Sequence, residues 1–150
     1  MPSSNHAPYL ATADFAVRRS ELACPAHSVK MMAKAAASAA DEVVFDLEDG
    51  CALAQKEAAR KTVIEAFQTL DFKSKVRALR TNGVHTKSFY RDVMEVVEAA
   101  GANIDVLVLP KVHEAADVQF ADGLLTEIEE SKDLPPGRIK LEALIESAKG

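Results

Sequence analysis

Hydrophobic and polar positions along the chain form two alternating patterns. Short, mostly apolar runs predict buried strands, and longer stretches with apolar residues every three or four positions predict amphipathic helices. The predicted strands are 20–24, 42–47, 75–80, 106–109 and 141–145, and the predicted helices are 27–40, 55–70, 88–100 and 115–131. Nearly continuous apolar strands between such helices are typical of a parallel sheet. With right-handed connections, we expect sequential strand order and all four helices on the outer face.

The number of units indicates which α/β architecture this is. Four strand–helix units and a fifth strand make about half of a (β/α)8 TIM barrel, which usually has about 250 residues. We therefore expect residues 18–150 to be the amino-terminal part of a TIM-barrel domain. Residues 1–17 are expected to be a flexible tail. A half barrel would leave two open strand edges.

Composition and charge narrow the class of protein. Of the 150 residues, 48% are hydrophobic, and the formal net charge is −5, which argues against a nucleic-acid partner. No apolar run reaches the roughly 20 residues of a membrane span, and the first residues do not resemble a secretory signal. A disulfide between Cys24 and Cys51 is chemically feasible, but free thiols in a reducing cytoplasm fit the chain better.

Charged residues follow three of the predicted strands. Asp46, Glu48 and Asp49 follow the second strand, Arg80 ends the third, and Glu146 closes the fifth. Because the carboxyl ends of parallel strands meet at one edge, we expect Asp46, Glu48, Arg80 and Glu146 to converge there. One guanidinium among carboxylates suits a divalent metal that holds a small acid.

Each of these residues has two interpretations that the sequence leaves open. Glu146 is either a Mg²⁺ ligand or half of a salt bridge with Arg80 or a lysine. Arg80 either binds a carboxylate or enolate oxygen, or pairs with Asp46 or Glu48. Asp46 and Glu48, on the same side of their strand, either raise each other's pKa for general acid–base chemistry or cap the next helix and form ion pairs.

Other reactive or basic residues also allow two interpretations. Arg18, Arg19, Lys30 and Lys34 either hold phosphates together or form an ordinary solvated face. Cys24 is either a nucleophile or a small buried filler. No pair of histidines has metal-ligand spacing.

Several segments in this order resemble the citrate lyase β-subunit-like family of acyl-CoA lyases. The most specific are Asp46-Leu-Glu-Asp, Leu-Pro-Lys111-Val and Ile-Glu146-Ser-Ala; the others are 19–25, Lys34, 40–45, 56–60 and 76–82. The resemblance covers about residues 18 to 150. Residues 88–101 are most similar to the malyl-CoA and methylmalyl-CoA lyase branch.

The resemblance implies a (β/α)8 barrel and Mg²⁺-dependent, reversible cleavage of a 3-hydroxyacyl-CoA into an acyl-CoA and a 2-oxo acid such as glyoxylate. It implies that Glu146 is a metal ligand and that Arg80 holds the oxo acid and the developing enolate. Asp46 and Glu48 match the acidic surroundings of the site. A CoA pocket is implied at Ala23, Ser28 and Lys34. The family also suggests a homo-oligomer, a trimer or a hexamer.

The sequence departs from the family pattern at Pro25-Ala26, usually Pro-Gly, and at Ser28, where a basic residue is common. These changes bear on how firmly phosphates are held. The family's second metal carboxylate and a lid residue from a neighbouring subunit would lie beyond the fifth strand, outside this sequence. The alternatives are a citramalyl-CoA or citryl-CoA lyase, or a non-catalytic acyl-CoA-binding module.

Overall fold

A parallel sheet organises the computed structural model, which describes residues 18–150. Its strands are β1 (Glu21–Pro25), β2 (Glu42–Asp46), β3 (Val76–Arg80), β4 (Val106–Leu109) and β5 (Lys140–Ala143). Their order in the sheet is β1-β2-β3-β4-β5, and every pairing is parallel. The predicted strand order is therefore confirmed. The predicted tail, 1–17, lies outside the described residues.

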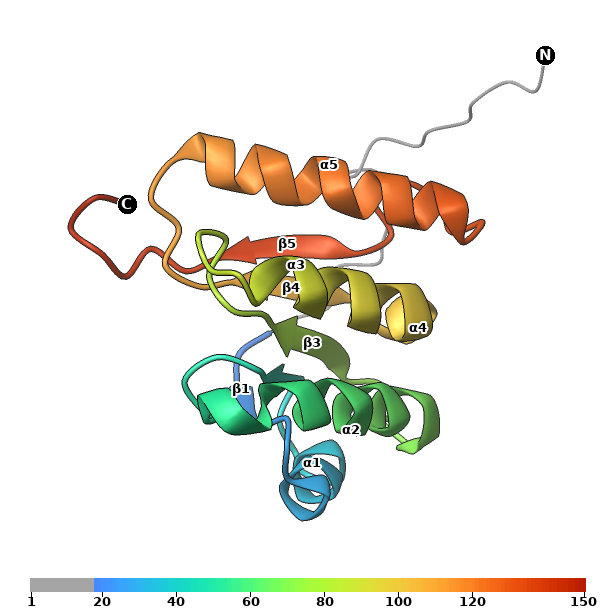
Figure 1. The fold of residues 1–150 in the computed structure, drawn as a ribbon. Coiled ribbons are helices and arrows are strands. Elements are labelled where there is room, and N and C mark those ends of the chain that lie inside the picture. The colour runs from blue at the N-terminus through green and yellow to red at the C-terminus, as the bar shows by residue number, and fades with distance from the viewer. Residues whose placement is uncertain (1–17) are drawn as a thin grey trace.

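Helices cover one side of this sheet (Figure 1). They are α1 (Val29–Ala36), α2 (Lys56–Thr69), a continuous run of α3 (Phe89–Asp92), the π-helical η2 (Val93–Val97) and α4 (Glu98–Ala100), and then α5 (Ala115–Ser131). Short 3₁₀ turns lie at η1 (Leu53–Gln55) and η3 (Gly101–Asn103). Among residues 18–150, no helix combines the length and apolar character that crossing a membrane requires.

Two predicted elements have boundaries that differ from the structure by two residues or more. Helix α1 is shorter than the predicted 27–40 because the Ser28 hydroxyl caps its start, accepting from the Met31 N–H. Beyond its end, the Ser38 hydroxyl accepts from the Ala40 N–H, a local bond that competes with helix. Strand β5 ends at Ala143, so Glu146 lies three residues beyond the strand instead of closing it.

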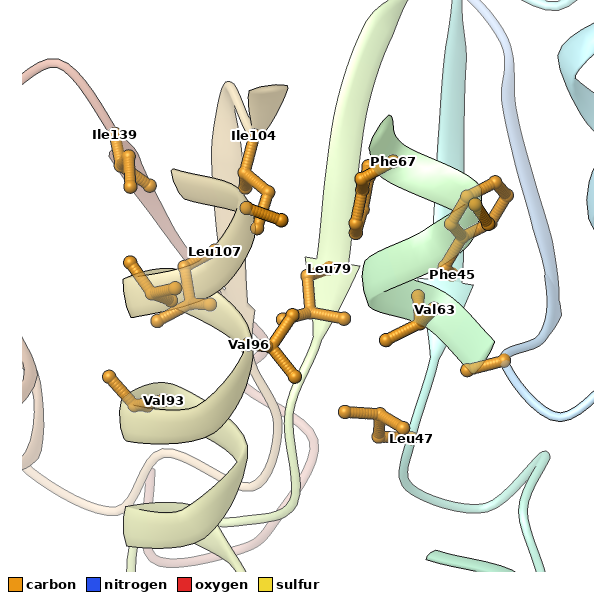
Figure 2. Packing of buried hydrophobic residues seen from close by; sticks show 14 of the residues in the cluster. Phe45, Leu47, Val63, Phe67, Leu79, Val93, Val96, Ile104, Leu107 and Ile139 are labelled. Carbon is orange, nitrogen blue, oxygen red and sulfur yellow. The ribbon is translucent and has the colours of Figure 1, made fainter. Parts of the chain in front are cut away.

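The main core lies between the sheet and the helices. Figure 2 shows Phe45, Leu79 and Leu107 of the strands facing Val63 and Val96 of the helices. All five side chains are fully buried. Burying one such side chain contributes about 1.5–3 kcal/mol. This layer holds the strands at fixed positions, and it therefore fixes where their carboxyl ends stand.

The opposite face of the sheet is concave and carries a smaller apolar cluster. It consists of Val44, Val76, Ala78, Val106 and Val108, with Leu144 packed against them. The curvature is evident from Arg18, whose Nη1 contacts Glu42 of β2 at 3.2 Å and Glu142 of β5 at 2.5 Å. Because β3 and β4 separate these strands, the sheet must curl for one side chain to reach both. This is the inner face of a partial barrel.

Candidate active site

The site begins with a buried ion pair between neighbouring strand ends. Asp46 and Arg80 are register partners at the ends of β2 and β3. Arg80 Nε donates to Asp46 Oδ1 at 2.8 Å, and Nη2 donates to Oδ2 at 2.6 Å. This two-pronged geometry is the strong form of a guanidinium–carboxylate contact. The hydrogen bonds to Asp46 raise the pKa of Arg80 despite its partial burial.

Asp46 also organises the loop that follows it. Its Oδ1 accepts from the Glu48 N–H and its Oδ2 from the Gly50 N–H, both at 2.7 Å. A Cβ on residue 50 would stand 2.5 Å from Asp46 Oδ2, so the loop needs glycine there. Asp46 therefore caps its own turn and not the next helix.

Of the two interpretations of Asp46, the structure supports the ion pair and not the raised pKa. Burial raises its pKa, but the hydrogen bonds from Arg80 and from the Glu48 and Gly50 amides outweigh burial, and the net pKa is lowered. Asp46 is thus held as a carboxylate at neutral pH. Its chemical role is to hold Arg80 and the loop.

Glu48 stands between two cations. Its Oε1 accepts from Lys111 Nζ at 2.7 Å, and its Oε2 lies 3.9 Å from Arg80 Nη1. The side chain is 8% exposed, and its Oε2 is the buried side-chain polar atom without a hydrogen-bond partner within residues 18–150. A buried carboxylate oxygen without a donor is unusual, because leaving it unsatisfied costs free energy. This oxygen is available to a ligand, a water or a metal-bound water.

Lys111 connects Glu146 to the same group of charged side chains. Directly after Pro110, it has a φ of 53°, a left-handed conformation that is uncommon for a lysine. In this conformation its N–H donates to Glu146 Oε1 at 3.0 Å, while its ammonium contacts Glu48 and, at 3.5 Å, Asp49. Glu146 is thus held by a main-chain N–H, and not by an ion pair with Arg80.

The structure thereby brings the four predicted residues together at the carboxyl ends of the strands. Together with Lys111 they form one connected series, Asp46–Arg80–Glu48–Lys111–Glu146. Sequence reasoning gave no role to Lys111, although it stands in one of the most specific motifs. A lysine two residues after a buried strand, with acidic residues after two other strands, was the available signal.

The oxygen donors of this series suit a hard divalent cation. Asp46 has both oxygens occupied by hydrogen bonds. Glu48 Oε2 has no donor, and Glu146 is exposed at the mouth of the site. Magnesium binds through one or two carboxylates and keeps several waters. The residues present therefore fit Mg²⁺, with Glu146 and Glu48 as the carboxylates free to serve it.

The residues suggested for a CoA pocket lie around β1 and α1. Ala23 is exposed on the inner face of β1, Ser28 caps α1, and Lys34 is exposed in its last turn. Within the described residues, no hydrogen bond or ion pair links these three to Arg80 or Glu146. Nothing in the contacts assigns them a ligand.

The structure does not support the interpretation in which Arg18, Arg19, Lys30 and Lys34 hold phosphates together. Arg18 forms ion pairs with Glu42 and Glu142, and Arg19 forms an ion pair with Asp41. Carboxylates already occupy both guanidinium groups. This leaves the exposed Lys30 and Lys34, four residues apart on α1, as the basic residues near the carboxyl end of β1.

A second group of metal-ligand types was not foreseen, because its members follow different strands. Asp117 Oδ1 lies 3.0 Å from His85 Nε2, and its Oδ2 accepts from the His113 N–H at 2.8 Å. The His85 and His113 rings are stacked, 15° from parallel, with centroids 4.9 Å apart. In-plane lone pairs of parallel rings cannot meet at one ion. Asp117 is also bound in the capping box of α5, so the group fastens a loop to that helix.

Cys24 is a buried thiol and not an activated nucleophile. Burial, together with nearby Asp46, raises its pKa to about 11, which leaves little thiolate at neutral pH. Both Cys24 and Cys51 are free and buried. The filler interpretation of Cys24 therefore fits the structure.

The curled parallel sheet, the outer helices and the charged strand ends define part of a TIM barrel whose site lies at the carboxyl face. Residues 19–150 match the HpcH/HpaI aldolase/citrate lyase family, and the chain belongs to that family. The resemblance to citrate lyase β-subunit-like proteins is therefore confirmed.

Relatives and solved structures agree with this assignment. An L-malyl-CoA/β-methylmalyl-CoA lyase of Cereibacter sphaeroides is 44% identical over 135 residues, covering 88% of this chain and 41% of that protein. The citrate lyase β subunit of M. tuberculosis, solved with oxaloacetate and magnesium, is 34% identical with a TM-score of 0.64, covering 89% of this chain and 51% of that one. Haloferax volcanii malate synthase shares the fold with a TM-score of 0.81 at 20% identity, over 92% of this chain and 45% of that one. The chain spans less than half the length of the first of these relatives.

Proposed function

We propose that the protein cleaves a 3-hydroxyacyl-CoA of the malyl-CoA or methylmalyl-CoA type, reversibly and with Mg²⁺, into an acyl-CoA and a 2-oxo acid such as glyoxylate. The observation that carries the proposal is the series Asp46–Arg80–Glu48–Lys111–Glu146 at the carboxyl ends of the strands. Similarity to a malyl-CoA/β-methylmalyl-CoA lyase favours this substrate class within the family.

The proposed reaction is a retro-Claisen cleavage. The 3-hydroxyl group loses its proton, the C2–C3 bond breaks, and the electron pair passes to C2 as a thioester enolate, which a proton then converts to the acyl-CoA. C3 becomes the carbonyl of the oxo acid. Negative charge therefore lies first on the 3-oxygen and then passes to the thioester oxygen of the enolate, and the site must stabilise it.

Arg80 is the residue proposed to bind those oxygens. Asp46 fixes its Nε and Nη2, so the guanidinium plane is set before substrate arrives. Its remaining donors include Nη1, which lies 3.9 Å from Glu48 Oε2, beyond hydrogen-bond reach. A preorganised donor of this kind stabilises developing charge without reorganisation during the reaction. The carboxylate of an oxo acid matches the same planar fork.

Glu146 and Glu48 are the residues proposed to hold Mg²⁺. When bound, the ion would supply Lewis-acid stabilisation of the oxo-acid oxygens. Asp46 serves the reaction by positioning Arg80, and Glu48 completes the catalytic residues of the proposal. Ala23, Ser28 and Lys34 would line the CoA pocket, with Lys30 and Lys34 as cations for its phosphates. We further propose a cytoplasmic location, on the two free thiols, and a homo-oligomer, on the family resemblance.

The test is release of glyoxylate from malyl-CoA by the protein at its full natural length, with and without EDTA. Free CoA thiol is measured in parallel. Glyoxylate formation that EDTA abolishes and Mg²⁺ restores is expected. Thiol release without glyoxylate would indicate a thioesterase, and binding of the thioester without either product would indicate a non-catalytic module. Release of pyruvate from citramalyl-CoA or of oxaloacetate from citryl-CoA, without glyoxylate from malyl-CoA, would replace the substrate.

A further inference from the structure

Two cations on one face of α2 have no part in the proposed chemistry, but one of them contacts the loop that carries Glu48. Lys56 and Arg60 are four residues apart, so they project from the same side of the helix. Lys56 Nζ donates to three acceptors: the Leu47 carbonyl at 2.7 Å, the Glu48 carbonyl at 2.9 Å and Asn82 Oδ1 at 2.5 Å. An ammonium has three N–H donors, so all of them are used.

The same network continues to the neighbouring strand. Asn82 follows Arg80 by two residues, and its Nδ2 donates to the Leu47 carbonyl at 3.2 Å. The N–H and Nδ2 of Asn82 both donate to Asp92, whose other oxygen accepts from Arg60 at 3.3 Å. Asn82, Asp92 and Arg60 are all buried. The β2 loop and the β3 loop are thus fastened to each other through α2.

This hydrogen-bond network restrains the main chain of Glu48. Its N–H is held by Asp46 Oδ1 and its carbonyl by Lys56, so the main chain is fixed on both sides of the residue. Only the side-chain torsions of Glu48 remain to be set, and the 2.7 Å hydrogen bond from Lys111 Nζ to Oε1 restrains them. Without Lys56, the Glu48 carbonyl would keep the weaker contact from the Cys51 N–H at 3.2 Å.

We propose that Lys56 is a positioning residue: it sets the Glu48 carboxylate beside Arg80 and Lys111 and has no contact with substrate itself. The inference rests on the proposed lyase function. An ordinary loop tether would contribute only to stability, whereas a positioning residue alters the reaction through Glu48. Lys61 is the matched control because it lies on the same helix, is exposed, and has Glu57 at 3.9 Å as its ion-pair partner among the described residues.

The first measurement compares Lys56→Met and Lys61→Met in the full natural-length protein. Lys56→Met is expected to lower kcat about 100-fold, the cost of a reactive group displaced by about 1 Å. The KM for the CoA ester should stay within about threefold of wild type, because the thioester-binding residues are untouched. Lys61→Met should stay within about twofold in both. Circular dichroism checks folding, and Lys56→Gln, which retains amide N–H donors, serves if Lys56→Met does not fold.

The second measurement separates positioning from stability. In a Glu48→Gln background, the further loss from Lys56→Met should shrink below about threefold, because residues that act through one another are not additive. If the loss in the double variant equals the product of the losses in the two single variants, the proposal is overturned. Hydrogen exchange at the amides of residues 47–51 gives a readout that needs no activity. Faster exchange in Lys56→Met, but not in Lys61→Met, is expected; unchanged exchange would overturn the proposal.

The two proposals fail in different ways. A wild-type protein that releases no oxo acid removes the lyase function, and the positioning role falls with it. An active wild type with a fully active, folded Lys56→Met variant removes only the positioning role. A Lys56→Met loss that appears wholly as a raised KM would place Lys56 in substrate binding instead, and would also contradict the proposal.

Discussion

The main-chain N–H of Lys111 donates to Oε1 of Glu146 at 3.0 Å. The two residues come from different loops, one after β4 and one after β5. The left-handed φ of Lys111, 53°, turns its N–H toward Glu146 while its ammonium reaches Glu48. Unusual backbone conformations of this kind persist where the surrounding contacts over-determine them, often at functional sites. One lysine thus sets the positions of both carboxylates proposed to serve the metal.

Replacing Glu146 with glutamine tests the metal assignment. The amide keeps an oxygen that can accept the Lys111 N–H, but it removes the negative charge that Mg²⁺ prefers. We expect Mg²⁺ affinity to fall at least about 10-fold, because replacing even a residue that only hydrogen-bonds to a metal ligand typically lowers metal affinity by that much. Calorimetric titration of Mg²⁺ into the natural-length protein measures it. Glu130→Gln, an exposed position on α5, is the control; equal affinity in both variants would refute the assignment.

Replacing Arg80 with lysine tests the proposed charge stabilisation. Lysine keeps the positive charge but loses the planar fork that binds Asp46 through two hydrogen bonds. We expect a loss of roughly 2–4 kcal/mol in transition-state stabilisation, measured as kcat/KM, by analogy with removal of one preorganised donor.

Arg77 on the same strand provides the control for Arg80. It forms an equivalent two-pronged pair with Asp105 through Nε and Nη2, both at 2.8 Å, on the outer face of the sheet. Arg77→Lys should therefore reduce thermal stability without reducing kcat/KM. Wild-type kcat/KM in Arg80→Lys would show that Arg80 only braces the strand ends.

The sheet could be predicted because each of its strands combines an apolar run with flanking charges. Phe45, Leu79 and Leu107 face the helices, and their neighbours along each strand face the inner side. The two-residue repeat expected of a strand therefore matches the burial that the structure shows. The convergence of Asp46, Arg80 and Glu146 followed from strand polarity alone. These relations depend on the regular geometry of parallel strands, which the sequence pattern specifies directly.

The partners of those residues could not be predicted, because they depend on loop conformation. The left-handed turn at Lys111 has no sequence signature, since the residue is not glycine or asparagine. The pKa of Asp46 depends on two loop amides whose positions follow from Gly50. Similarly, His85 and Asp117 meet only because the loops after β3 and β4 lie together. Spacing along the chain carries no information about such contacts.

Gly50→Ala should disturb the Asp46–Arg80 pair although neither of these residues is replaced. The new methyl group would stand 2.5 Å from Asp46 Oδ2, and Arg80 Nη2 and the Gly50 N–H hold that oxygen in place. Either the loop or the carboxylate must move, which displaces Glu48 as well. We expect a loss of about 1–3 kcal/mol in stability, as for other overpacked positions, together with reduced kcat. Gly123→Ala on α5, where a Cβ meets nothing within 4 Å, is the control in thermal and kinetic measurements; equal behaviour of the two variants would contradict the prediction.

Glu42 gives the fold a pH dependence of its own. Burial raises its pKa to about 7 from 4.5, with Arg18 lowering it in part and Glu142 and Glu21 raising it further. Between these values the folded state keeps a proton that the unfolded state has lost. The free energy of unfolding should therefore fall as pH rises from about 4.5 to about 7, by on the order of 2 kcal/mol, and then level off. The pKa of Asp46 is lowered, so this residue changes the stability only below the usual pKa range of an aspartate, outside the pH window of Glu42.

Urea unfolding at pH 5 and pH 8 measures this contribution. Glu42→Gln removes the titrating group and retains a polar side chain in the buried position, so its unfolding free energy should change less between the two pH values than that of wild type. Glu98→Gln, at an exposed position on α4, should keep the wild-type dependence. An identical pH dependence in wild type and Glu42→Gln would mean that Glu42 is ionised throughout. Arg18 would then fully offset its burial, and the contact between β2 and β5 on the concave face would be a permanent ion pair.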